Sequence, residues 1–216
     1  MTKLNKEQKR QQQVLAILAD IYGGSESALH YGSVFQLLIA VILSAQTNDN
    51  QVNQITDKLF YHFPDAAAFA ALEPAELEPY ISSCGLYKNK AKNIVATARL
   101  LQQEYGGEVP ADKELLMKLP GVGGKTANVV LSVGFNIPAL AVDTHVFRVA
   151  NRLGLANGKT PEQVEEQLCA IIPRQLWAEA HHWLIWHGRK ICTAQKPACD
   201  GCPLAELCPA HKHFKN

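Results

Sequence analysis

Helical periodicity dominates the hydrophobic pattern of this chain and limits its fold more than any other feature. Apolar residues recur three and four positions apart along most of the 216 residues, and no alternating strand pattern of useful length interrupts them. The first predicted helix has an apolar face of Val14, Leu15, Ile17, Leu18 and Ile21. Gly23 and Gly24 would end it. We therefore expect an all-α protein.

Further helices are predicted through the rest of the chain, separated by glycine and proline residues. Their expected ranges are Val34–Ala45, Gln51–Tyr61, Lys88–Tyr105, Ala111–Leu119, Thr144–Leu153, Thr160–Ile172 and Trp177–His187. Short acidic helices are expected between the second and third of these, with Pro74 and Pro79 at their boundaries.

No segment has the features of a membrane span or a secretory signal. The longest apolar run, Val34–Ala45, is too short to cross a bilayer. The basic, Gln-rich start MTKLNKEQKRQQQ lacks the apolar core of a signal peptide. We expect an intracellular protein, in which cysteines stay reduced. Because the net charge is only +1, any surface for an acidic partner must be local.

Four of the six cysteines lie close together near the end of the chain, in CTAQKPACDGCPLAELC. They are Cys192, Cys199, Cys202 and Cys208, separated by six, two and five residues. Such a loop can bring four thiolates to one centre, either tetrahedral zinc or a [4Fe–4S] cluster. Zinc usually takes two short paired spacings, so this wider layout favours iron and sulfur. A disulfide pair is the alternative, whereas the isolated Cys84 and Cys169 are expected in the core.

The stretch LPGVGGKTANVVLSVGF contains GGKT, which is typical of nucleotide phosphate loops. Such a loop needs a glycine six residues before the lysine, but Leu119 occupies that position and follows a predicted helix. The stretch instead predicts a helix–hairpin–helix, with a turn through Gly121, Gly123 and Gly124. Free N–H groups at the second helix's start could bind one phosphate of a DNA backbone. An ordinary glycine-rich connection is the alternative.

Lys125 would lie in the first turn of that second helix, where the helix dipole disfavours a positive charge. Together with partial burial, this placement would lower the lysine pKa from its usual value of about 10.4 and leave some free amine as a nucleophile. The simpler alternative is a lysine that only contacts a phosphate.

Asp143 precedes an amphipathic helix in VDTHVFRVANRL and is expected to cap it. A capping carboxylate could still present one oxygen to a reacting group. Arg148 and Arg152 would share one face of the same helix, four residues apart. They are candidate phosphate contacts, with a solvated helix face as the alternative.

These motifs together resemble the endonuclease III family of helix–hairpin–helix DNA glycosylases. The resemblance rests on LPGVGGKTANVV, AVDTHVFRVANR, HHWLIWHGRKIC and the cysteine loop, and it extends from about Val34 to Cys208. It implies two helical domains on either side of a DNA-binding cleft. Residues 27–137 would form a six-helix barrel that includes the helix–hairpin–helix. Residues 1–26 and 138–216 would form the second domain, with the cluster loop.

The resemblance also assigns roles to individual residues. It makes Lys125 the nucleophile and Asp143 the catalytic aspartate, and it makes the four cysteines of the loop the ligands of a [4Fe–4S] cluster. Gln46 would fill the space left by an extruded base, and Leu86 would be a wedge inserted into the duplex. The expected DNA contacts are Gly121, Val122, Gly123, Gly124, Arg148, Arg189 and Lys196. Read without the resemblance, Gln46 is a polar helix end and Leu86 a core residue.

The implied activity is that of a bifunctional glycosylase and abasic-site lyase, which removes oxidised pyrimidines from double-stranded DNA through a lysine Schiff base and β-elimination. We expect a bacterial, cytoplasmic and nucleoid-associated monomer. One departure is Gly124, where relatives commonly carry a basic or larger residue; glycine weakens a helix by about 1 kcal/mol relative to alanine.

Two alternatives are weighed against this activity. The adenine glycosylase branch lacks the nucleophilic lysine and has an extra C-terminal domain, so Lys125 and the end of the sequence at Asn216 argue against it. A non-enzymatic DNA-binding module with a structural metal would not require Lys125 and Asp143 together.

Overall fold

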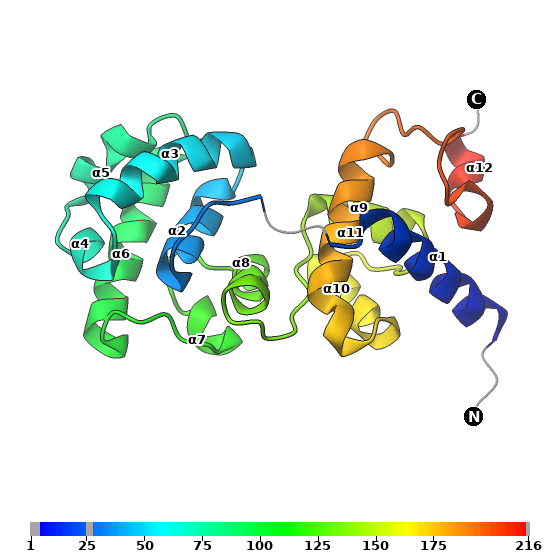
Figure 1. The fold of residues 1–216 in the computed structure, drawn as a ribbon, viewed down its shortest axis with the longest axis horizontal. Helices are drawn as coiled ribbons and strands as arrows, with labels where there is room; N and C mark the ends of the chain where they lie inside the picture. Colours follow the sequence, from blue (N-terminus) through cyan, green and yellow to red (C-terminus); the bar gives the residue numbers. More distant parts are fainter. Residues whose placement is uncertain (1–4, 25–27, 215–216) are drawn as a thin grey trace. The chain divides into compact units, whose positions relative to one another are not determined.

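The computed structural model describes residues 5–24 and 28–214, and these residues form helices and loops without a strand (Figure 1). The predicted all-α class is therefore confirmed. The chain divides into two compact units, one made of the described residues of Met1–Glu26 and Pro138–Asn216, the other of those of Ser27–Ile137. The predicted first boundary, between residues 26 and 27, lies outside the described residues. No described helix is long and apolar enough to cross a membrane.

The unit Ser27–Ile137 is built around one helix that is apolar on every side. This helix, α2 (Val34–Ser44), begins at the capping residue Ser33 and is buried along most of its length. Its neighbours are α3 (Asp49–His62), α6 (Tyr87–Tyr105), α8 (Gly124–Val129) and the π-helix Val130–Gly134, and Figure 1 shows it between α6 and α8. The remaining helices of the unit are α4 (Ala66–Ala70), α5 (Pro74–Ile81) and α7 (Lys113–Met117).

One predicted helix boundary in this unit is wrong. Pro74 is the first residue of α5, as expected, because a first-turn N–H has no partner within its helix. Pro79, however, lies inside α5 rather than between helices. In a helix of only eight residues a proline near the end removes a single backbone hydrogen bond, so the last turn can still form.

The second unit packs α1 (Lys6–Tyr22) and α9 (Thr144–Arg152) against α11 (Trp177–Lys190), and α10 (Pro161–Ile171) against α9. Two 3₁₀ turns, Arg174–Leu176 and Ala205–Leu207, and the short α12 (His211–Phe214) complete it.

The apolar face of α1 differs from the prediction at its end. Val14, Leu18 and Tyr22 are buried in the core, whereas Ile21 is 43% exposed. The buried residues are four apart and form one ridge along the helix, and this ridge is the part that packs against the core. Leu15 and Ile17 lie beside the ridge and are partly buried.

Candidate functional site

The hairpin between α7 and α8 has a turn that only glycine can form. Gly121 has φ +78°, and a Cβ added there would lie 2.9 Å from Asn93 Nδ2. The Thr97 hydroxyl donates to Pro120 O at 2.8 Å and fixes the turn to α6. An added Cβ would meet no atom within 4 Å at Gly123 or Gly124, so a larger side chain would fit at both positions.

The N-terminus of α8 presents backbone N–H groups, as the sequence predicted. The first hydrogen bond of the helix runs from Ala127 N to Gly123 O at 2.9 Å, so the N–H groups of Gly124, Lys125 and Thr126 precede it. The capping residue Gly123 has no side chain to accept from them. Together with the dipole, they make this end of α8 suitable for an anion.

Lys125 lies in the first turn of α8, as predicted, but it is exposed. The partial burial that we expected for its side chain is therefore wrong. The positions just before it, Gly123 and Gly124, are open as well, since a Cβ added at either would meet no atom within 4 Å. An exposed amine beside an anion site can reach a bound ligand without any rearrangement of the protein.

Asp143 caps α9 with a single carboxylate oxygen. Its Oδ1 accepts from both His145 N and Val146 N at 2.8 Å. The cap therefore fixes the carboxylate and leaves Oδ2 as the oxygen that can face a ligand. Asp143 is half-buried and belongs to the unit of Pro138–Asn216, whereas Lys125 belongs to the unit Ser27–Ile137.

Arg148 and Arg152 do not lie on a solvated helix face, because both hold the backbone that leads into the cysteine loop. Arg148 donates to Cys192 O and Gly188 O, each at 3.0 Å. Arg152 donates to Thr193 O at 2.7 Å and to Ala194 O at 2.8 Å. The Arg148 guanidinium thus donates to carbonyls within the protein, and the structure does not support the predicted phosphate contact of this residue.

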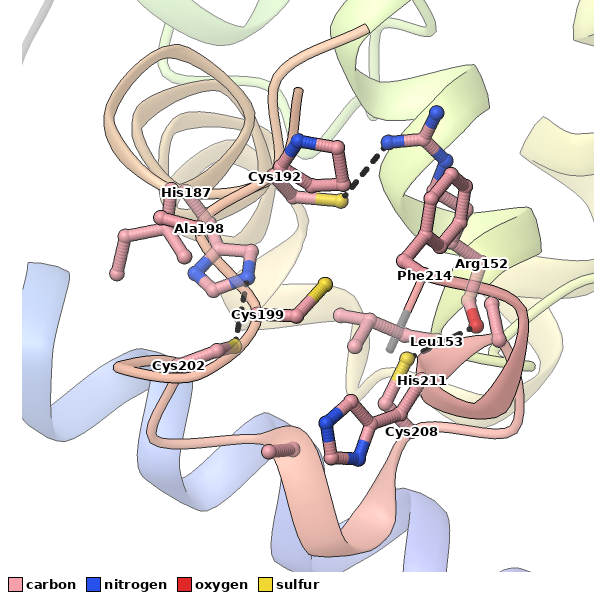
Figure 2. A pocket seen from close by; sticks show the side chains of 14 residues that line it. Arg152, Leu153, His187, Cys192, Ala198, Cys199, Cys202, Cys208, His211 and Phe214 are labelled. Atoms are coloured by element: carbon pink, nitrogen blue, oxygen red, sulfur yellow. Dashed lines mark hydrogen bonds between the residues drawn. The ribbon is translucent and has the colours of Figure 1, made fainter. Parts of the chain in front are cut away.

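The four cysteines of the loop border one hollow of about 360 Å³, part of it open to solvent (Figure 2). None of them forms a disulfide, so the disulfide alternative is wrong. Arg152 also reaches the hollow, with Nη1 3.5 Å from Cys192 Sγ, and the Cys208 thiol points to Arg152 O at 3.3 Å. Cys84 is buried in the core, as predicted, and Cys169 is half-buried.

The chemistry of this hollow suits a cluster with thiolate ligands. Burial raises the pKa of the Cys202 and Cys208 thiols, so they stay protonated until a metal displaces the protons. No group of three or more His, Cys, Asp or Glu in the described ranges is placed to hold a single metal ion, yet all four sulfurs face the same hollow. Their donor set and shared hollow fit the [4Fe–4S] cluster.

Two histidines complete the lining. Burial lowers the pKa of His187 to about 4, so its ring is neutral at physiological pH. Its Nδ1 lies 3.3 Å from the Tyr22 hydroxyl and its Nε2 lies 3.8 Å from Cys202 Sγ. When Tyr22 donates to Nδ1, the other nitrogen carries the hydrogen and can donate to the sulfur. His211 Nε2 is buried at the hollow without a partner in the described part of the chain, as expected beside a group that accepts hydrogen bonds.

Gln46 and Leu86 are both exposed on the unit Ser27–Ile137, in loops that meet where Gly85 approaches the backbone of Gln46. Both have left-handed backbone, with φ of 57° and 58°, and Leu86 is 60% exposed. Leu86 is thus not the core residue that its type alone suggests. In the other unit, Arg189 and Lys196 are both exposed, on the last turn of α11 and in the cysteine loop.

Lys90 is a buried residue that the sequence analysis passed over. It lies on the apolar stripe of α6 with Ala91, Ile94 and Val95, and it is only 5% exposed. A lysine on the apolar face of a predicted helix was the available signal, since such a side chain needs internal acceptors.

Two known protein families match this chain, one over the part that contains the hairpin and one over the cysteine loop. Residues 39–174 match the HhH-GPD superfamily of base excision DNA repair proteins. Residues 192–208, from the first to the last cysteine of the loop, match the iron–sulfur binding domain of endonuclease III.

Individual relatives match over most of their length. The chain is 51% identical over 190 residues to endonuclease III of Rickettsia conorii, which covers 88% of this chain and 90% of the relative. It is 49% identical over 180 residues to endonuclease III of Escherichia coli K12, covering 83% and 85% of the two chains.

Solved structures give the same result. A trapped endonuclease III–DNA covalent intermediate is 44% identical, with a TM-score of 0.92 over 98% of this chain and 99% of that one. A thermostable thymine-DNA glycosylase, 23% identical with a TM-score of 0.86, shares the fold.

Proposed function

Because the chain belongs to the endonuclease III family of the HhH-GPD superfamily, we propose that it is a bifunctional DNA glycosylase and abasic-site lyase. Its substrate would be duplex DNA with an oxidised pyrimidine or an abasic site. The observation that carries this proposal is the exposed Lys125 amine in the first turn of α8, beside N–H groups suited to a phosphate. A relative 44% identical over nearly the whole chain is described as a trapped covalent intermediate with DNA, which supports a covalent route.

The hairpin positions the nucleophile on its substrate. A DNA phosphate bound at the start of α8 would accept hydrogen bonds from the N–H groups of Gly124 and Thr126. Lys125 lies in the same turn, so a phosphate bound there would hold the neighbouring sugar within reach of the lysine amine. After loss of its ammonium proton, the Lys125 amine attacks C1′, the bond from C1′ to the base breaks, and the base leaves as an anion that takes up a proton.

Asp143 would stabilise the positive charge that develops on the sugar as the base departs. Its Oδ1 is held by two backbone N–H groups, so the carboxylate needs no reorganisation when Oδ2 faces the sugar. The nitrogen of Lys125, now bonded to C1′, loses a proton as the C1′–O4′ bond of the sugar breaks, and O4′ takes up a proton. The opened sugar is then joined to Lys125 as a Schiff base. Loss of a C2′ proton from this Schiff base breaks the C3′–O3′ bond and expels the 3′ phosphate by β-elimination. The strand is cut on the 3′ side of the lesion.

Gln46 and Leu86 would act on the duplex before the chemistry. A base must leave the stack to reach a nucleophile, and a damaged base leaves more readily. An exposed leucine can enter the stack as an apolar wedge, and the neighbouring Gln46 can occupy the vacated space with hydrogen-bonding groups.

The cysteine loop would hold a [4Fe–4S] cluster through Cys192, Cys199, Cys202 and Cys208. When bound, the cluster supplies a covalent cross-link across a loop that has little apolar core of its own. Arg189, just before this loop, and Lys196, within it, would contact the DNA backbone as point charges. We propose that the protein acts as a monomer in the bacterial cytoplasm, on the nucleoid.

A cleavage assay tests this function. The substrate is an end-labelled duplex with one 5-hydroxyuracil, and an undamaged duplex is the control. The proposal expects cleavage at the lesion only, with an unsaturated sugar left on the 3′ end. Binding without cleavage would favour a non-enzymatic DNA-binding module, and release of the base without cleavage would contradict the lyase step.

A further inference from the structure

Two exposed residues of the unit Ser27–Ile137, Gln46 and Leu86, have an unfavourable backbone conformation. Gln46 (φ 57°) follows the end of α2, and Leu86 (φ 58°, ψ 29°) is the residue before α6. Left-handed backbone is uncommon outside glycine, because Cβ crowds the following carbonyl, and it persists only where the surroundings impose it. Something in this unit therefore holds both residues in place.

The two residues lie on adjoining loops. A Cβ placed on Gly85 would contact Gln46 O at 3.5 Å and Gln46 Cβ at 3.9 Å, so the two backbones touch at this point. Gln51, in the first turn of α3, donates to Ser83 O at 2.6 Å and ties the loop before Leu86 to the segment after Gln46. Gln46 and Leu86 thus form one surface, the Gln46–Leu86 edge.

Lys90 connects the two loops from below. Its Nζ donates to Leu43 O at 2.8 Å, to Ala45 O at 2.6 Å and to the Thr47 hydroxyl at 3.2 Å. These acceptors lie on both sides of Gln46 and use all three hydrogens of the ammonium group.

Lys90 also lies in the first turn of α6, the helix that begins directly after Leu86. Its backbone N–H donates to Leu86 O at 3.0 Å, a helical hydrogen bond that any residue other than proline would form at this position. Lys90 therefore links the start of α6 to the loop around Gln46, and only the contacts of its amine depend on lysine. Burial lowers its pKa, and the three acceptors offset that cost of keeping a charge inside the unit.

We propose that Lys90 is the positioning residue of the Gln46–Leu86 edge, and that it holds both side chains in register for extruding a damaged base. This inference rests on the proposed function. The competing explanation is that Lys90 only stabilises the fold. The two explanations differ in one respect: a positioning residue acts through Gln46 and Leu86, so its effect must vanish when those side chains are removed.

A double-mutant cycle separates these explanations. The variants are Lys90→Met alone, Gln46→Ala with Leu86→Ala, and all three changes together. The measured quantity is the rate at which 2-aminopurine, placed beside 5-hydroxyuracil in a duplex, becomes fluorescent as the stack opens. Residues in one hydrogen-bonded network couple, whereas independent ones add.

Arg99→Met is the matched control. Arg99 also lies on α6 and also donates to carbonyls at the end of another helix, Ala70 O at 3.1 Å and Leu72 O at 2.7 Å. It does not touch the Gln46–Leu86 edge. Its replacement removes the same kind of interaction and should leave the rate of stack opening nearly unchanged in either background.

In otherwise wild-type protein, we expect Lys90→Met to slow opening about tenfold, and to change it less than about twofold when Gln46 and Leu86 are already alanine. Equal losses in the two backgrounds overturn the proposal and leave Lys90 as a stabiliser of the fold. If Lys90→Met does not fold, Thr47→Val takes its place in the cycle, with an expected loss of about threefold that disappears in the double-alanine background. An equal loss for Thr47→Val in both backgrounds likewise overturns it.

The wild-type reaction distinguishes this failure from failure of the proposed function. If wild-type protein opens and cleaves the damaged duplex while the cycle is additive, the function stands and the positioning role falls. If wild-type protein neither opens nor cleaves it, both fall together.

Discussion

Replacing Arg152 with methionine should make the protein release its cluster faster. The Arg152 guanidinium donates to Thr193 O and Ala194 O and lies 4.5 Å from the centre of the Phe214 ring. Methionine keeps an apolar side chain beside the hollow but removes both hydrogen bonds and the ring contact. Thr193 and Ala194 then lose their hydrogen bonds to α9, whereas Cys192 O keeps its bond from Arg148.

The size of the effect follows from these contacts. Two hydrogen bonds from a charged donor at a half-buried position and one cation–π contact together contribute about 2 kcal/mol. If the cluster leaves only when the loop opens, a loss of ~2 kcal/mol in opening free energy raises the open population ~30-fold.

The assay follows the visible absorption of the cluster after addition of an excess iron chelator. Iron content is measured first, so that the variants start from equal loading. Arg174→Met is the matched control, because Arg174 is exposed and has a ring contact, 5.9 Å from Trp177, on the same unit. Bleaching of Arg152→Met within about twofold of wild type would refute the reasoning, because effects of that size are within the scatter of independent substitutions.

Cys199→Ala should remove the cluster and its yellow-brown colour, whereas Cys84→Ala should keep both, because Cys84 is buried in the core of the unit that does not contain the loop. Iron analysis of anaerobically purified protein checks this, and stoichiometric zinc without iron in the native protein would contradict it. Gly124→Arg should tighten binding to undamaged duplex, because the position has space for a larger side chain, and should steepen the slope of log K against log salt by about 0.9 if the added charge contacts one phosphate. Binding is measured at several salt concentrations, and an unchanged slope would argue that the hairpin does not contact the DNA backbone. Asp143→Asn keeps an oxygen for the cap but loses the charge, so base release should slow by about 10²-fold, with a smaller loss on a pre-formed abasic site; equal losses in the two assays would contradict the assigned role.

The helices and the cluster loop could be predicted from the sequence because their causes are local. The period of apolar residues predicts helices, and four cysteines within one short loop predict a shared centre. The turn at Gly121 is also local, since a positive φ selects glycine.

The roles of several charged residues could not be predicted, because their partners are distant in sequence. Arg148 and Arg152 donate to carbonyls of residues 188–194, which lie 40 to 44 residues further along the chain, after α10 and at or beyond the end of α11. Their spacing on α9 indicates a shared face, but only the packing of α11 against α9 decides what that face meets. The role of Lys90 could not be predicted for the same reason, because the carbonyls that its amine binds lie at the end of α2, far from α6 in the sequence.

The exposure of Lys125 shows the limit of a local argument in another way. Its position in the first turn follows from the glycine turn before it, whereas burial depends on what other segments place over that turn. The sequence therefore predicts the position of Lys125 in the helix but not the solvent exposure of its side chain.

Reductive trapping tests the central claim most directly, namely that Lys125 forms a covalent bond to DNA. Borohydride is added during turnover on the 5-hydroxyuracil duplex, and the protein–DNA adduct is measured by gel and located by peptide mass. Lys118→Gln is the matched control, because Lys118 is an exposed lysine of the same hairpin whose loss removes one charge and no proposed nucleophile. We expect wild type and Lys118→Gln to form the adduct on Lys125, and Lys125→Gln to bind the lesion without forming it. An adduct at the wild-type level in Lys125→Gln would contradict the account, and Lys125 would then only contact a phosphate.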